Sequence, residues 1–270
     1  MSAPPFQAAV GPSLAAAIGA VAEHTARLLR PCADTSVPIP GASWTVGEAA
    51  AHLFKANELM ADLAAGRERT YGDGTAGSLA AANSVSLAAF TERDGTVLAD
   101  GIVRCAEAFT EAARTRPADA PVFTPLGPMD LGTLGSYLLT HMLGHGYDIA
   151  VALRRPHMID RERVDLTLPF LTTAMPRVVN PRTAAGHSAC YELRLRGGSR
   201  FAATFTDGAV DVTARPPRRP DCTIVAEPVT FLLLALGRCT SMGALSRGKI
   251  VAWGRKPWLS PRFTSLFTAP

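Results

Sequence analysis

The sequence has 270 residues, of which 47% are hydrophobic and 19% charged, and its formal net charge is +4. This composition is typical of a globular protein with enough core to be stable without disulfides, as one large or two ordinary domains. No apolar run approaches the roughly 20 residues that a membrane span needs, so we expect no membrane partner. The N-terminal MSAPPFQAAV has no basic stretch followed by an apolar core, which favours a cytoplasmic protein over a secreted one.

The charges divide unevenly along the chain. Residues 1–160 hold 11 basic and 16 acidic side chains (−5), whereas residues 161–270 hold 16 and 7 (+9). The basic residues of the second half are mostly single arginines without interleaved aromatics, so they favour binding of an anionic small molecule over nucleic acid. The five cysteines form no C-x-x-C pair, which argues against a disulfide framework and a thiolate zinc site. They are Cys32, Cys105, Cys190, Cys222 and Cys239.

The first half has helical periodicity. Apolar residues at helical spacing predict helices over residues 7–29, 45–65, 78–91, 96–116 and 131–153. Thr45 and Glu48 form a capping box at the start of the second of these, and Asp130 caps the last. The glycine-rich residues 66–78 predict a mobile loop able to act as a lid, and residues 117–129 a proline-rich connection. Together the helices predict a four-helix bundle.

The second half changes to the period of strands. Alternating runs at residues 190–196, 200–206 and 209–214, separated by Gly197-Gly198 and Asp207-Gly208, predict a meander with tight turns. A strand at 222–226, a helix at 229–236 begun by Pro228, a strand at 249–253 and a short closing helix at 256–268 follow. The sequence therefore predicts a bundle domain of residues 1–160 and a smaller α+β domain of residues 161–270.

The stretch THMLGHGYD carries the chemistry of the predicted bundle. On a helix, His141 and His145 lie one turn apart and Asp148 falls three residues further, all within an arc of about 60°. Two imidazoles at this spacing can bind one metal ion, and His52 is our candidate for a third ligand. The alternative is a hydrogen-bonded pair of core histidines. Asp148 either fixes the tautomer of a ligating imidazole or moves a proton, or simply bonds a nearby backbone group or arginine.

The same predicted helix contains four glycines, each costing about 0.5 to 1 kcal/mol relative to alanine. They are Gly132, Gly135, Gly144 and Gly146. We expect close approach of a neighbouring helix or a ligand to offset this cost.

Two sets of residues resemble the mycothiol-dependent maleylpyruvate isomerase family. Trp44-Thr45-Val46 followed by Ala51-His52-Leu53, and later His145-Gly146-Tyr147-Asp148-Ile149-Ala150, resemble motifs of the family's DinB-like helical bundle. This resemblance covers most of residues 7–155. The family's sterol-carrier-like C-terminal domain resembles the segments PDCTIVAEP, LLALGR and SRGKIVAWG. The two resemblances occur in the order in which the family carries its domains.

The resemblance implies a divalent metal, normally zinc, held by three bundle residues, with the sulfur of mycothiol at the open position. His52 and His145 match two of the family's ligands, whereas His141 stands where the family has a glutamate. Three neutral imidazoles leave the metal its full charge of +2, so a bound thiol should be more acidic than with a carboxylate ligand.

We therefore expect a metal-dependent enzyme that holds a low-molecular-weight thiol, mycothiol by resemblance, as a thiolate for attack on a small electrophile. Transfer of the sulfur is favoured over cis-trans isomerisation of the maleylpyruvate type. An arginine of the basic half, Arg238 or Arg247, is expected to hold a carboxylate of the substrate, and we choose Arg238. Two alternatives remain: a non-catalytic protein that binds a metal or an apolar ligand, and an iron site with the same three histidines.

Overall fold

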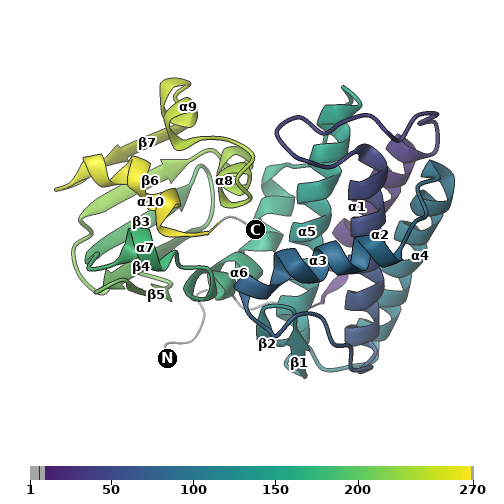
Figure 1. The fold of residues 1–270 in the computed structure, drawn as a ribbon. Helices are drawn as coiled ribbons and strands as arrows, with labels where there is room; N and C mark the ends of the chain where they lie inside the picture. The colour runs from purple at the N-terminus through teal and green to yellow at the C-terminus, as the bar shows by residue number, and fades with distance from the viewer. Residues whose placement is uncertain (1–5, 7–9, 269–270) are drawn as a thin grey trace. The chain divides into compact units, whose positions relative to one another are not determined.

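The computed structural model describes residue 6 and residues 10–268, which fall into two compact units. One unit extends to Ile159 and the other begins at Asp160. The first is helical and the second contains a β-sheet, so the predicted fold class, α followed by α+β, is confirmed (Figure 1). No helix among the described residues is both long and apolar enough to cross a membrane.

A bundle of α1, α2, α4 and α5 makes up the first unit, with α3 lying across its outside (Figure 1). The bounds are α1 Pro12–Leu29, α2 Val46–Ala64, α3 Leu79–Ala89, α4 Gly95–Arg114 and α5 Leu131–Ala152, with a 3-10 turn, η1, at Ala76–Ser78. The first predicted helix started at residue 7, and residues 7–9 lie outside the described part of the chain.

The predicted caps set where two bundle helices begin. Thr45 Oγ1 accepts from the Glu48 amide at 3.3 Å, while Glu48 Oε2 accepts from the Thr45 amide at 2.8 Å. Asp130 Oδ1 accepts from the Thr133 amide at 2.6 Å at the start of α5. Both caps satisfy amides that the first turn leaves without a helical partner. They fix the phase of α2 and α5, and with it the side-chain positions further along each helix.

The proline-rich connection predicted over residues 117–129 contains two strands that the sequence analysis did not predict. Two short antiparallel strands, β1 Pro121–Thr124 and β2 Gly127–Asp130, form a hairpin there. Thr124 and Gly127 pair across the two-residue turn, and Gly127 has a φ of 86°, which favours glycine. The hairpin is easily missed in the sequence, because each strand has four residues and one of them is proline.

The second unit has a sheet whose described strands run in the order β5-β4-β3-β6-β7. The bounds are β3 Ala189–Leu195, β4 Arg200–Thr206, β5 Ala209–Thr213, β6 Cys222–Ala226 and β7 Ile250–Trp253. The predicted meander is confirmed for β3, β4 and β5, which pair antiparallel. Asp207 (φ 47°) and Gly208 (φ 86°) form the tight turn between β4 and β5, where both positions need positive φ. The sequence did not show that β6 pairs parallel to β3.

Helices accompany this sheet, and one prediction about them needs correction. The bounds are α6 Arg161–Ala174, η2 Met175–Arg177, α7 Pro181–Ala184, α8 Pro228–Ala235 and α9 Ser241–Ser246. The sequence analysis assigned no element to the residues of α6 or α9, although Asp160 caps α6 by accepting from the Arg163 amide. The single closing helix is instead η3 Pro257–Leu259, α10 Ser260–Phe263 and η4 Thr264–Leu266, a series of short turns.

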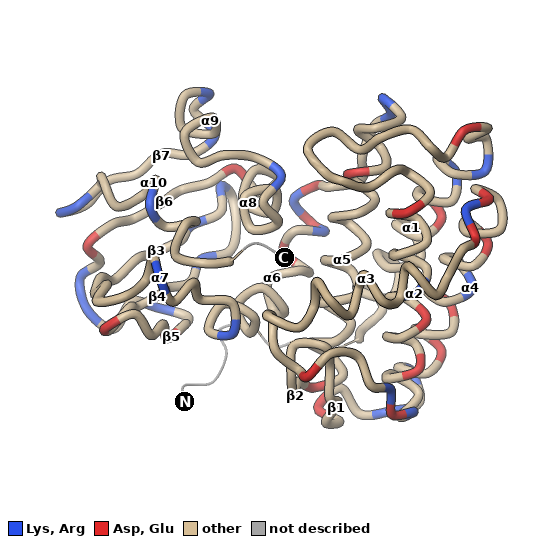
Figure 2. The backbone as a smooth tube through the Cα atoms, in the orientation of Figure 1, with Lys and Arg blue, Asp and Glu red and all other residues tan. Residues whose placement is uncertain are grey.

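Basic residues are spread over the strands and loops of the second unit (Figure 2). Several converge on Asp221, which is 1% exposed. Its carboxylate lies 3.0 Å from Arg218, 2.7 Å from Arg255 and 3.5 Å from Lys256. It also accepts from the Cys190 amide, and these contacts outweigh burial and hold the pKa of the Asp221 carboxyl well below its usual range. Part of the basic surplus thus ties the start of β6 to the segment after β7.

Candidate metal centre

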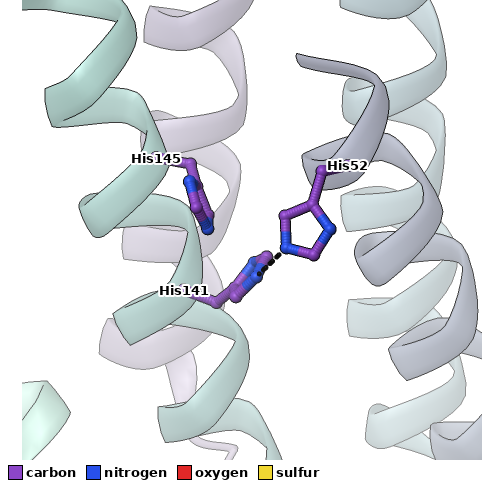
Figure 3. A group of neighbouring side chains, drawn as sticks. All are labelled: His52, His141 and His145. Carbon is purple, nitrogen blue, oxygen red and sulfur yellow. Dashed lines mark hydrogen bonds between the residues drawn. The ribbon is translucent and has the colours of Figure 1, made fainter. Parts of the chain in front are cut away.

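Three histidines converge between α2 and α5 of the first unit. His52 comes from α2, and His141 and His145 come from successive turns of α5 (Figure 3). Each offers one ring nitrogen, and these nitrogens all lie within 4.8 Å of one another. The structure therefore brings together all three residues that we proposed as metal ligands.

The glycines of α5 help to fix which of its faces meets α2. A Cβ at Gly135 would lie 3.1 Å from Leu14, and one at Gly146 would lie 3.2 Å from Thr25, both on α1. Counting 100° per residue, the face with Gly135 and Gly146 lies about 80° to 100° from His145. The expected close approach is thus confirmed at these two glycines, and α1 is the neighbour. Packing of the glycine face on α1 leaves the histidine face of α5 available to α2.

The geometry of the group fits a metal with imidazole ligands. His52 Nε2 and His141 Nε2 are 3.0 Å apart. Two nitrogens bound to one tetrahedral zinc ion at 2.0–2.1 Å would lie roughly 3.3 Å apart. Without a metal one of the two nitrogens must donate to the other, and a metal would need the rings to separate by only about 0.3 Å. The nitrogens of His52 and His141 are thus close to a ligating arrangement.

His52 is suited to act as a neutral ligand. It is 5% exposed, and burial, together with the nearby charge of His145, lowers its pKa to about 3. At neutral pH its ring therefore keeps a lone pair on one nitrogen. A metal needs this form, because a protonated imidazole has no lone pair to give.

Asp148 lies beside the group. Its Oδ2 is 3.3 Å from His145 Nδ1, and its side chain is 10% exposed. The two atoms are close enough to form an ion pair, but His145 Nδ1 does not make a hydrogen bond of good geometry. A small rotation of either side chain would make Nδ1–H donate to the carboxylate, which would leave Nε2 of His145 to face a metal.

Trp44 covers one side of the histidines, a role that the sequence analysis did not assign. Its ring stacks on His145 with a centroid distance of 5.8 Å and an interplanar angle of 27°, and lies 4.9 Å from the ring of His52. The sequence feature that could have indicated this role is the position of Trp44 immediately before Thr45, the N-cap of α2. The residue before a cap often packs back on its own helix.

Arg238 belongs to the second unit, just after α8. Its Nη1 donates to the carbonyl oxygen of Leu236. Its expected contact with substrate stays a prediction.

We expect Asp148→Asn to weaken divalent metal binding by roughly 10- to 100-fold, since partners of ligating histidines contribute that much to affinity. Asparagine keeps the size of the side chain but removes the negative charge that favours a proton on Nδ1 of His145. Competition with a chromogenic chelator measures the affinity. Asp100→Asn is the matched control, because Asp100 pairs with Arg30 on the exposed surface of the same unit. Equal affinity in both variants would show that Asp148 does not support a ligand.

A helical bundle with a three-histidine group, joined to an α+β unit, defines a two-domain protein with a candidate metal centre. Residues 14–150 match the model of the mycothiol maleylpyruvate isomerase N-terminal domain, and residues 174–254 match the SCP-2 sterol transfer family. The first match spans half of the chain. The protein belongs to the mycothiol maleylpyruvate isomerase family, as the resemblance in the sequence implied.

A solved structure agrees on the fold. A histidine-to-alanine variant of mycothiol-dependent maleylpyruvate isomerase superposes with a TM-score of 0.53 at 12% identity, over 88% of this chain and 91% of the other. Another structure of mycothiol-dependent maleylpyruvate isomerase has a TM-score of 0.46 at 13% identity, over 84% and 88% of the two chains. No curated protein matches the chain at a significant level.

Proposed function

We propose that this protein is a metal-dependent enzyme that binds the sulfur of mycothiol at the three-histidine group and directs it at a small electrophile. The convergence of His52, His141 and His145, in a chain of this family, is the observation that carries the proposal. Three protein ligands leave one position of a tetrahedral metal open, whereas a closed structural site uses four. This favours an enzyme over a protein in which the metal is structural.

A divalent metal in this place, zinc in the first instance, would supply positive charge that favours the ionised form of a thiol whose pKa is otherwise near 8.5. The chain's own residues prepare the site. His52 enters as a neutral ring because it is buried. A small rotation would let Asp148 hold the proton of His145 on Nδ1, and Trp44 shields the histidines from water on one side. Arg238 is our proposed contact for a substrate carboxylate.

The reaction begins with a new bond between the thiolate sulfur and one carbon of an activated double bond, while the π electrons move to the adjoining carbonyl group. In transfer, the neighbouring carbon takes a proton and the sulfur stays attached. In isomerisation, the carbon skeleton rotates and the sulfur leaves with its electron pair. We favour transfer because His141 replaces the glutamate of the family, and the higher charge would make the sulfur a firmer ligand. Isomerisation is the second candidate, and family membership supports it.

The two reactions differ in what happens to the thiol. We expect mycothiol to be consumed one for one with product, because in transfer each turnover leaves the sulfur on the substrate. Mass spectrometry of the conjugate and a thiol assay on the same sample measure both quantities. The control reaction contains His52→Ala. Complete conversion of maleylpyruvate to fumarylpyruvate by a catalytic trace of mycothiol would show that isomerisation is right and transfer wrong.

The identity of the metal needs a separate measurement. Zinc and iron can share three imidazole ligands, and a non-catalytic protein could hold either. Elemental analysis of protein purified without added metal distinguishes zinc, iron and an empty centre.

A further inference from the structure

The segment from α9 through β7 to η3 exposes apolar side chains close together in the chain. Among the described residues, eight large hydrophobic side chains are exposed, and four of them fall within residues 242–258. These four are Met242 (66% exposed), Val251 (42%), Trp253 (47%) and Trp258 (68%), and we call them the apolar edge. They include two of the three tryptophans of the chain. A group of large apolar side chains left in water indicates an interaction surface.

The apolar edge follows one border of the sheet in the second unit. β7 is the last strand in the order of the described strands, and it pairs with β6. α9 packs against β7. The Lys256 amide donates to the Asp221 carbonyl at 2.8 Å, which holds the segment before η3 beside the start of β6. The elements that carry the four side chains are therefore neighbours in space as well as in sequence.

The two side chains from β7 lie on the face of the sheet opposite α8. Residues aligned directly across strands share one face. Val251 is aligned through β6 with Arg194 of β3, whose guanidinium lies over the Trp253 ring at 5.9 Å from its centroid. Phe201 belongs to the other face, where Phe231 of α8 packs against it. The apolar side chains of β7 are thus outside the core that α8 covers.

The same part of the chain carries positive charge alone. Residues 228–270 contain six basic and no acidic side chains. Arg247 and Lys249 are exposed between α9 and β7, and Figure 2 shows basic residues beside α9. Arg255 and Lys256 follow β7, where Asp221 neutralises part of their charge. The apolar edge therefore has a positive surround, which favours an anionic partner.

The mixture of charge and apolar surface distinguishes between anionic partners. A second copy of the chain would bring the same positive charge against itself, so charge repulsion opposes self-association. Nucleic acid bases stack on aromatic rings, but Met242 and Val251 offer them no ring. A lipid surface can use every member of the edge. Tryptophan and aliphatic side chains enter the boundary between headgroups and acyl chains, while lysine and arginine meet anionic headgroups.

We propose that the apolar edge docks this protein on the surface of an anionic lipid membrane. The expectation of no membrane partner rested on the lack of a spanning segment, and surface binding needs none. The docking surface lies in the second unit and shares no residue with the three-histidine group. It therefore adds a binding surface beyond the proposed function and does not depend on it.

Sedimentation of the full chain with vesicles tests the apolar part of the surface. The vesicles contain phosphatidylglycerol and phosphatidylcholine, and vesicles of phosphatidylcholine alone are the neutral reference. Trp253→Ser combined with Trp258→Ser removes both tryptophans of the apolar edge. Phe123→Ser is the control, because Phe123 is a 62% exposed aromatic residue on the hairpin of the first unit.

A second pair of variants tests the charge. Arg247→Gln combined with Lys249→Gln removes two positive charges beside the apolar edge. Arg27→Gln combined with Arg104→Gln removes two charges from exposed positions of α1 and α4, and is the matched control. Equal circular dichroism spectra show that all variants are folded.

We expect the full chain and both controls to bind the anionic vesicles, and to bind the neutral vesicles roughly 10-fold more weakly or less. The tryptophan variant and the charge variant should each bind the anionic vesicles roughly 10-fold more weakly than their controls. Absence of binding, equal binding to neutral vesicles, or equal binding by either variant and its control would overturn the inference.

A measurement on the unaltered chain needs no variant. Brominated phosphatidylcholine in the anionic vesicles should quench the tryptophan fluorescence of the bound protein, because bromine on the acyl chains quenches rings that enter the membrane. Sedimentation without quenching would show that the edge does not insert, and would overturn the inference. A dimer of the full chain that the tryptophan variant cannot form would do the same, since the edge would then meet a second copy.

Discussion

Replacing any one of His52, His141 and His145 with alanine is expected to lower divalent metal affinity by roughly 100-fold or more. Losing only the partner of a ligand costs about 10- to 100-fold, and removal of the ligand itself should cost more. With two ligands left, dialysed protein should lose its metal. Elemental analysis after dialysis and chelator competition measure the effect.

The helical circular dichroism signal should persist in all three variants, because the bundle is held by its apolar core and its caps and not by the histidines. His24→Ala is the control. His24 belongs to the same unit, but its Nε2 meets the Pro156 carbonyl 2.9 Å away, outside the group. Full metal occupancy in the three single variants would refute the assignment of ligands.

A carboxylate in place of His141 should keep the metal and change its acidity. His141→Glu introduces a competent ligand for zinc, and the negative charge lowers the net charge of the site from +2 to +1. A thiol or water at the open position is then less acidic. The acidic limb of the pH–rate profile should move upward by about 1 pH unit or more, as expected for one added charge a few ångströms away.

The pH profile of the rate, measured alongside metal content, tests this expectation. His141→Gln is the matched variant, because glutamine has the shape of glutamate without its charge. An acidic limb that stays in place or moves to lower pH in His141→Glu would contradict the role given to His141. If this variant also releases thiol more readily, it should sustain more turnovers per mycothiol.

Local sequence determined much of the bundle. The capping box of Thr45 and Glu48 and the cap at Asp130 could be predicted from the sequence, because each hydrogen bond joins residues only three positions apart. The i, i+4 spacing of His141 and His145 likewise placed two rings on one face of α5. The turn at Asp207 and Gly208 was predictable because positive φ strongly favours such residues.

Tertiary structure decided what distant segments do together. His52 meets His141 across 89 positions of sequence, and no spacing rule brings them within 3.0 Å. The contact between these two rings depends on the rotation of α5 about its own axis. The packing of Gly135 and Gly146 against α1 helps to set that rotation.

The parallel pairing of β6 with β3 also arises from long-range packing, whose free energy depends on the whole chain. Short-range patterns therefore fixed where the helices begin and which residue types they present. Only the assembled bundle placed three imidazoles around one point, because burial and helix packing act between residues far apart in the chain.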